Sequence, residues 1–189
     1  SGGRGDMARL AILDRDGEIN ADSDDFVRSI AEWQPLPGSI DAIARLCEAG
    51  FVVTVASNQS GVGRGLFTRE TVYGMHKKLR RLVRAAGGEI AAIAFCPHRP
   101  DEGCSCRKPG TGLYTRLAKE TGLSLESAIV VGDSLRALEA GDRVGAELWL
   151  VRTGKGPRSL AQAADKPPAW WPRVQVADDL AAVVSGSAR

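Results

Sequence analysis

Five short apolar runs, separated by longer segments with helical spacing, constrain the fold of this chain more than any other feature of its sequence. The runs cover residues 8–13, 51–56, 90–95, 128–131 and 148–151, lengths typical of buried strands. Helices are expected between the predicted cap Ser39 and Gly50, between the predicted cap Thr68 and Gly87, and over residues 112–120, 135–143 and 177–184. This alternation predicts an α/β fold, a doubly wound parallel sheet with helices on both faces.

The domain organisation is expected to be simple. Residues 1–6 (SGGRGD) are polar and glycine-rich and precede Met7, which indicates a cloning remnant and not a signal peptide. Residues 7–189 are expected to form one domain, with residues 155–172 as a Pro- and Trp-containing loop. We expect a cytoplasmic protein, and the reducing cytosol argues against disulfides.

Charge and hydropathy disfavour two classes of partner. The chain has 25 Lys+Arg against 23 Asp+Glu, a formal net charge of +2, so bulk electrostatics give no reason to bind nucleic acid. No apolar run approaches the roughly 18 residues of a membrane span. His76 lies in a basic helical run that is expected to be a solvated face. We expect a monomer that acts on a small molecule, with no nucleic-acid or membrane partner.

Polar residues follow four of the predicted strands directly. The segments are residues 14–17 (DRDG), 57–61 (SNQSG), 96–109 (beginning CPH and ending RKP) and 132–134 (GDS). In doubly wound sheets, ligands bind beyond the carboxyl ends of the strands. The four segments are therefore predicted to meet at one site.

These segments carry the residue types that phosphoryl transfer needs. Asp14 and Asp16 form a carboxylate pair, in which one group can attack phosphorus while the other protonates the leaving oxygen. Ser57 and Lys108 can bind the charged phosphoryl oxygens. Asp133 can join Asp14 in holding Mg²⁺ through hard oxygen ligands. Each motif alone is common as a capped turn or a helix cap, but the ordered set indicates a catalytic site.

The same motifs resemble those of the haloacid dehalogenase (HAD) superfamily of phosphohydrolases. The strings LDRDGEIN, SNQSGVGRGLF, CPHRP, CSCRKP and GDS are similar to one branch, which contains heptose 1,7-bisphosphate 7-phosphatases and the related histidinol-phosphatases. The resemblance runs from about residue 10 to residue 156. It implies a Rossmann-like HAD fold and Mg²⁺-dependent hydrolysis of a phosphate monoester, on a route to activated heptose for lipopolysaccharide.

The resemblance also implies roles for individual residues. Asp14 would be the nucleophile that forms an aspartyl-phosphate, and Asp16 the general acid and then the base. Ser57 and Lys108 would hold the phosphoryl oxygens. Mg²⁺ would bind Asp14, Asp133 and the backbone carbonyl of Asp16. The positions that would contact substrate are Asp22, Ser23, Asp25, Asn58, Gln59, Ser60, Arg107 and Ser134.

Two residues depart from the pattern of the branch. Ala137 stands where members often carry a further acid that supports the metal, and its presence predicts weaker or altered support for Mg²⁺. Glu18 stands where Thr or Val is usual. A carboxylate there would repel an anionic substrate unless it turns away or pairs with a base.

Three of the four cysteines and one of the two histidines lie close together in the sequence. Cys96, His98, Cys104 and Cys106 form a Cys₃His set that predicts a structural Zn²⁺ site, because a closed tetrahedral site leaves no position for a catalytic water. The alternative is a loop with reduced free thiols. A zinc clip would hold the loop rigidly and place Arg107 and Lys108, and the resembling branch has the same clip.

The segments between the motifs are too short to hold a cap domain, so the site is expected to be uncapped. The zinc loop and residues 22–37 would form its lid, and Arg64, Arg107 and Lys155 are candidates to bind a second phosphate. Hydrolysis of heptose 1,7-bisphosphate is the leading function. The alternatives are a histidinol-phosphatase or another small-molecule phosphatase, a binding module with low turnover, and a nucleic-acid end phosphatase.

Overall fold

The computed structural model describes residues 8–187, so the expected remnant at residues 1–6 lies outside the described residues. Six parallel strands form one sheet in the order β3-β2-β1-β4-β5-β6. The strands are β1 (Arg9–Leu13), β2 (Phe51–Asn58), β3 (Ile90–Cys96), β4 (Ile129–Gly132), β5 (Glu147–Val151) and β6 (Val174–Ala177). The chain leaves β1 in one direction along the sheet and returns beside it at β4, which places a topological switch point between these two strands.

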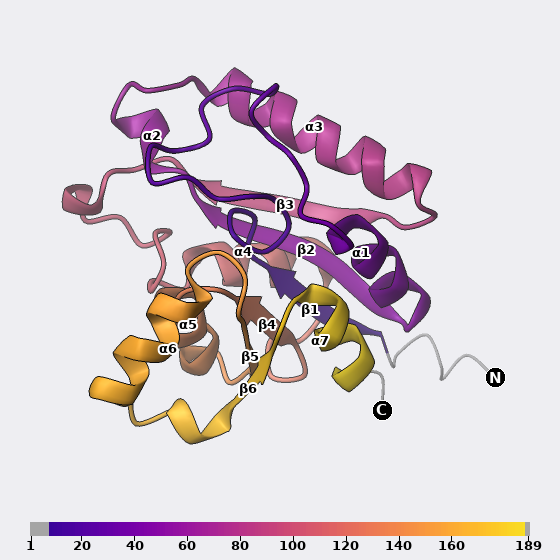
Figure 1. Cartoon of the computed structure of the whole chain (residues 1–189), viewed down its shortest axis with the longest axis vertical. Coiled ribbons are helices and arrows are strands. Elements are labelled where there is room, and N and C mark those ends of the chain that lie inside the picture. Colours follow the sequence, from indigo (N-terminus) through magenta and orange to yellow (C-terminus); the bar gives the residue numbers. More distant parts are fainter. Residues whose placement is uncertain (1–7, 188–189) are drawn as a thin grey trace.

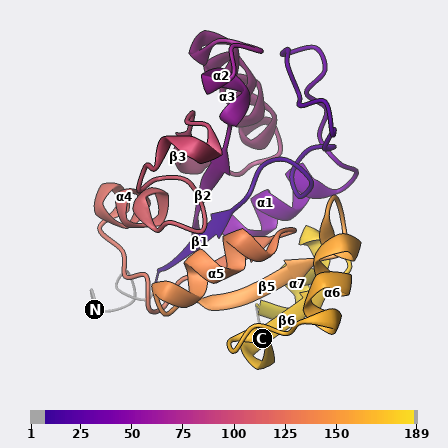
Figure 2. The same ribbon diagram turned by 90° about the vertical axis from the view of Figure 1, so that its left-hand side faces the viewer.

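Helices cover both faces of the sheet (Figures 1 and 2), as the alternation predicted. The helices are α1 (Ser39–Glu48), α2 (Ser60–Gly63), α3 (Arg69–Ala85), α4 (Gly112–Thr121), α5 (Leu135–Arg143), α6 (Gly156–Asp165) and α7 (Leu180–Ser187), with 3₁₀ turns η2 (Pro100–Glu102) and η3 (Trp171–Arg173). Side chains of α1, α3 and α7 pack in the core on one face. Side chains of α4, α5 and α6 pack on the other, so both faces of the central strands are buried.

Two expectations near the C-terminus are wrong. Residues 155–172 are not a loop, because α6 occupies Gly156–Asp165. Pro157 stands in the first turn of α6, where the missing N–H costs nothing, so the proline that indicated a loop instead begins a helix. The helix expected over residues 177–184 begins only at Leu180, and β6 precedes it. This strand lies at the sheet edge and is half-buried, which explains its weak apolar signal.

One predicted helix cap is confirmed and the other is wrong. Thr68 caps α3, since its hydroxyl accepts a hydrogen bond from the Thr71 N–H. Ser39 is already inside α1, and Gly38 takes the cap position with a left-handed φ of 79°. The Ser39 hydroxyl instead donates to the carbonyl of Ile19, at 2.6 Å, and thereby ties the loop after β1 to α1.

The connections at the carboxyl ends of the strands position the site. The long loop between β1 and α1 contains only isolated bridges, at Asp16–Asn20 and Asn20–Pro35, and no cap domain is inserted within residues 8–187. Figure 1 shows this loop on the same side of the molecule as α2 and the segment after β3. No helix among the described residues is long and apolar enough to cross a membrane.

Candidate active site

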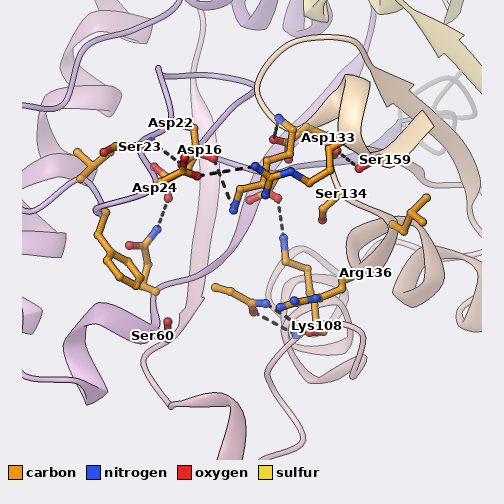
Figure 3. Close-up of a pocket in the computed structure, with 18 of the residues that line it drawn as sticks. Asp16, Asp22, Ser23, Asp24, Ser60, Lys108, Asp133, Ser134, Arg136 and Ser159 are labelled. Carbon is orange, nitrogen blue, oxygen red and sulfur yellow. Dashed lines mark hydrogen bonds and ion pairs between the residues drawn. The ribbon is translucent and has the colours of Figure 1, made fainter. Parts of the chain in front are cut away.

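An open pocket lies beyond the carboxyl ends of β1, β2 and β4, at the switch point of the sheet. It has a cavity volume of about 360 Å³. Figure 3 shows its polar lining, which comes from segments far apart in the sequence. The predicted residues that line it are Asp14, Asp16, Asp22, Ser23, Asn58, Gln59, Ser60, Arg107, Lys108, Asp133, Ser134 and Lys155. The four strand-end segments therefore meet, as the sequence predicted.

Asp14 and Lys108 form an ion pair at the base of the pocket. Lys108 Nζ lies 3.0 Å from Asp14 Oδ2, and the lysine side chain is only 2% exposed. The same ammonium donates to the carbonyl of Ala56 at 3.0 Å. Two of its three protons are thus used within the protein, which leaves one for an incoming anion. A buried positive charge beside a carboxylate lets that carboxylate approach a phosphate without full charge repulsion.

Asp133 supplies a second buried carboxylate next to Asp14. Its Oδ2 accepts the Lys155 N–H at 2.9 Å, and a Cβ on Gly17 would lie 2.1 Å from that oxygen. Gly17 has a φ of +86°, so both the backbone conformation and this close approach require glycine. Burial raises the pKa of Asp133 to about 7, and the charge of Asp14 acts in the same direction. Two crowded carboxylates of this kind form a hard-oxygen donor set that fits Mg²⁺.

Asp16 is held by several donors at once. Arg15 Nη2 lies 2.9 Å from Asp16 Oδ1, where Asn20 Nδ2 also donates at 2.8 Å. Gln59 Nε2 donates to Oδ2 at 2.8 Å. Burial alone would raise the pKa of Asp16, but the Arg15 charge and the hydrogen bonds from Asn20, Gln59 and Arg15 outweigh it and lower the pKa. Asp16 is therefore ionised at neutral pH.

Two predicted substrate-binding residues bond mainly to other residues of the site. Asn58 holds the Lys108 backbone from both sides: its Oδ1 accepts the Lys108 N–H at 3.0 Å and its Nδ2 donates to the Lys108 carbonyl at 3.3 Å. Gln59 Nε2 donates to the Ser57 Oγ at 2.7 Å as well as to Asp16. The Ser57 hydroxyl accepts this bond, so its own proton is not used by Gln59.

Glu18 turns away from the pocket and is 1% exposed, so it does not face a substrate. Its Oε2 accepts the Asp14 N–H at 2.7 Å, directly behind the predicted nucleophile. Its Oε1 is buried and has no hydrogen-bond partner among the described residues. Burial raises the pKa of Glu18 well above its usual value, with the charges of Asp14 and Asp133 acting in the same direction. The other departure, Ala137, is fully buried, and its carbonyl accepts from the Tyr114 hydroxyl.

The structure corrects the predicted set at its edges. Ser57, Asp25 and Arg64 do not line the pocket. Ser57 is 1% exposed near the end of β2, Asp25 borders an adjacent hollow, and Arg64 stacks over the Phe26 ring at 5.8 Å. Several lining residues were not predicted from the sequence, namely Phe26, Val27, Leu135, Arg136, Arg158, Ser159 and Gln162. Asp24 also lines the pocket, although only its neighbours Asp22, Ser23 and Asp25 were predicted to contact substrate. Arg158, Ser159 and Gln162 belong to α6, in a segment whose proline and tryptophan residues indicated a loop and not a helix.

The wall of the pocket carries both acidic and basic side chains. Arg107 and Arg136 both line the pocket, and the pKa of Arg107 is lowered first by burial and then by the Arg136 charge. In the view of Figure 3, Lys108 and Arg136 lie across the pocket from Asp22 and Asp24. Asp22 pairs with Lys155, their charged atoms 3.7 Å apart. Polar groups of both signs suit a substrate that carries phosphate and hydroxyl groups.

The predicted zinc ligands come together in the loop after β3. One ligand atom from each of Cys96, His98, Cys104 and Cys106 lies within 4.8 Å of all the others. His98 Nδ1 is 3.2 Å from the Cys106 Sγ, and the Cys96 and Cys104 sulfurs are 3.5 Å apart. All three cysteines are free thiols. A tetrahedral Zn²⁺ with Zn–S bonds of about 2.3 Å separates its sulfurs by about 3.8 Å. The Cys96 and Cys106 sulfurs are 2.9 Å apart, so this pair would have to separate to bind the ion, while the residue types and their gathering suit zinc.

Comparisons with known proteins agree with this geometry. A family model described as HAD-hydrolase-like matches residues 105–183. The D-glycero-beta-D-manno-heptose-1,7-bisphosphate 7-phosphatase of Pseudomonas putida is 48% identical over 175 residues, which are 93% of this chain and 97% of that protein. The structure of the D,D-heptose 1,7-bisphosphate phosphatase of Bordetella bronchiseptica complexed with magnesium and phosphate has a TM-score of 0.88 at 47% identity, covering 95% of this chain and 97% of that one.

A second solved structure is the D,D-heptose 1,7-bisphosphate phosphatase of Burkholderia thailandensis. It has a TM-score of 0.72 at 40% identity, with 95% of this chain and 97% of that chain covered. The likeness thus extends over nearly the whole length of each protein and is not confined to the motifs. This chain belongs to the D-glycero-beta-D-manno-heptose-1,7-bisphosphate 7-phosphatase family of HAD-like hydrolases.

Proposed function

We propose that this protein is a Mg²⁺-dependent phosphatase that removes the 7-phosphate of D-glycero-beta-D-manno-heptose 1,7-bisphosphate. One observation carries the proposal: a pocket in which Asp14 pairs with buried Lys108, beside Asp133, in a chain 48% identical to a phosphatase of that name. The relative of known structure that holds magnesium and phosphate supports the cation and the anion at such a site.

In the first half of the reaction, a carboxylate oxygen of Asp14 attacks phosphorus, and the bond from phosphorus to the sugar oxygen breaks. Lys108 and the Ser57 hydroxyl bind the nonbridging oxygens, and their charge and dipole stabilise the transition state. Asp16 donates a proton to the leaving oxygen. Asp16 is ionised in the free protein, so it would take up this proton from solvent as the dianionic phosphate binds, because the added negative charge disfavours the charged form of Asp16.

In the second half, water attacks the aspartyl-phosphate on Asp14. Asp16, ionised once it has given up its proton, accepts a proton from that water, and inorganic phosphate is released. Asn58 and Gln59 act by holding Lys108, Asp16 and Ser57 in place, a role that their hydrogen bonds support.

Two metal ions belong to the proposal. Asp14, Asp133 and the backbone carbonyl of Asp16 would hold Mg²⁺, which when bound lowers the repulsion between the anionic nucleophile and the anionic phosphate. Cys96, His98, Cys104 and Cys106 would together hold a structural Zn²⁺. A rigid zinc loop would keep Arg107 and Lys108 at the pocket.

The second phosphate of the substrate would bind along the basic wall. Arg107 is the predicted ligand there, and Arg136 adds a second guanidinium beside it. Lys155 also lines the pocket and pairs with Asp22. Asp22, Ser23, Ser60 and Ser134 would contact the sugar hydroxyls.

The test is a direct comparison of substrates with purified protein. Both anomers of heptose 1,7-bisphosphate and histidinol phosphate are incubated with and without Mg²⁺, and phosphate release is measured. We expect Mg²⁺-dependent release of one phosphate per bisphosphate, a sugar 1-phosphate as product by ³¹P NMR, and no release by Asp14→Asn. Higher kcat/KM on histidinol phosphate would overturn the substrate assignment, and no release from any substrate would favour a binding module.

A further inference from the structure

Arg15 is a charged side chain with no exposed surface, although it lies between two residues of the proposed catalytic site. Its relative exposure is 0%, and it is among the largest fully buried side chains of the protein. An arginine is rarely buried completely unless its charge is paired and its donors are used. The proposed chemistry gives Arg15 no contact with substrate, so its burial requires a different explanation.

The guanidinium of Arg15 makes a forked contact with Asp16, donating to both of its carboxylate oxygens. Its Nε lies 3.1 Å from Asp16 Oδ1, while its Nη2 lies 2.9 Å from Oδ1 and 3.2 Å from Oδ2. Asn20 and Gln59 complete the set of donors, one to each carboxylate oxygen. A forked contact fixes the plane of a carboxylate as well as its distance, which a single ammonium cannot do.

The remaining nitrogen of the fork is anchored on α3, an element that contributes nothing to the lining of the pocket. Nη1 lies 3.2 Å from the Met75 Sδ and 3.5 Å from the His76 Nε2. His76 is buried and packs its ring edgewise against Phe95 at 5.8 Å, so it is not part of a solvated basic face as the sequence indicated. Burial lowers the pKa of His76 to about 3, which leaves a neutral ring able to accept a hydrogen bond from Arg15.

We propose that Arg15 is a positioning residue for Asp16: anchored on Met75 and His76, its fork sets the carboxylate in the orientation that proton transfer to the leaving oxygen requires. The inference rests on the proposed phosphatase function and deepens it. These contacts link α3, a helix that packs on one face of the sheet, to the catalytic edge. A residue with this role affects the step in which the leaving group is protonated and has little effect on substrate binding.

A comparison of substrates with different leaving groups therefore distinguishes a positioning role of Arg15 from a general structural role. An alkyl phosphate such as the heptose bisphosphate needs a proton on its leaving oxygen, whereas 4-nitrophenyl phosphate gives a stable phenolate that needs none. Loss of a well-placed general acid costs about 10²–10⁴-fold in rate, and a misplaced one costs part of that. Arg15→Lys keeps the charge and removes the fork, so it tests geometry and not electrostatics.

We expect Arg15→Lys to lower kcat/KM on the heptose bisphosphate about 10- to 100-fold and to change kcat/KM on 4-nitrophenyl phosphate less than about threefold. The ratio kcat/KM is compared because it reports the first half of the reaction, before Asp16 acts as the base on water in a step that both substrates share. His76→Leu, which removes the anchor, is expected to show the same dependence on the leaving group. His76→Gln keeps an acceptor at this point and is expected to restore most of the rate. Arg116→Lys, an exposed arginine on α4, is the matched control.

Each outcome decides the inference. Equal losses of kcat/KM on both phosphates, or an unchanged kcat/KM on the heptose bisphosphate, would overturn the positioning role. If Arg15→Lys does not fold, the His76→Leu and His76→Gln pair decides in the same way. A wild-type enzyme inactive on both phosphates would refute the proposed function itself, and this inference with it.

Discussion

The buried carboxyl of Glu18 makes a prediction about how stability changes with pH. Glu18 is 1% exposed and accepts the Asp14 N–H through Oε2. Burial, together with the charges of Asp14 and Asp133, raises the pKa of its carboxyl well above the usual 4.5. The folded protein therefore keeps a proton on Glu18 at pH values where the unfolded chain has released it.

The sign and the size of the effect follow from proton linkage. Above pH 4.5 the folded state binds one more proton at Glu18 than the unfolded state does, so the free energy of unfolding decreases as pH rises. The slope is about 1.4 kcal/mol per pH unit for as long as the folded carboxyl stays protonated. For a chain of this size, that slope corresponds to about 3–5 °C in Tm per pH unit.

Glu18→Gln removes the titration and keeps an oxygen for the Asp14 N–H. The protonated wild-type carboxyl already leaves one donor without an acceptor at Oε1, and the amide NH₂ leaves two, so the variant loses about 1–3 kcal/mol at every pH. We expect the variant to be less stable than the wild type near pH 5 and more stable near pH 8. The two curves cross because only the wild-type curve contains the Glu18 slope.

Urea unfolding followed by circular dichroism, in a Mg²⁺-free buffer without chelator so that the proposed Zn²⁺ stays bound, measures both curves from pH 5 to pH 9. The difference between the two free energies of unfolding at each pH reports the titration of Glu18, because His76 and Asp133 titrate in both proteins. Parallel curves over this range would refute the reasoning and would mean that Glu18 is ionised in the folded state. The control Glu120→Gln, at an exposed site on α4, is expected to give a pH-independent difference.

Three further predictions concern the metals and the anion site. The pKa of Asp133 is raised to about 7, so Mg²⁺ competes with a proton there. Isothermal titration calorimetry is expected to show the Mg²⁺ affinity falling about tenfold per pH unit below pH 7. A constant affinity from pH 7 to pH 5 would contradict this. Lys108→Met removes the buried ammonium beside Asp14 and is expected to lower kcat/KM about 10²–10³-fold in steady-state assays; a change below about fivefold would exclude Lys108 from transition-state binding. Cys106→Ala is expected to reduce bound zinc, measured by mass spectrometry, from about one ion per chain and to lower Tm; full zinc content in the variant would rule out Cys106 as a ligand.

The sequence by itself determined the fold class and the residues at the centre of the site. Strands β1 to β5 are visible because each is a continuous apolar run between polar segments, a local pattern that burial on both faces demands. Asp14, Asp16, Asp133 and Lys108 are found from sequence because parallel strands all end at one edge of the sheet. The Cys₃His cluster is local too, since its members lie within eleven residues of one another.

Only the tertiary structure decided what the flanking side chains do. Whether Gln59 faces a substrate or bonds to Asp16, and whether Glu18 repels a phosphate or lies behind the nucleophile, depends on side-chain orientation, which neighbours distant in sequence determine. Arg15 contacts a helix 60 residues away, a contact that no local spacing encodes. The physical reason is that apolar periodicity reports burial along one element, whereas the partners of a buried polar group are set by how several elements pack together.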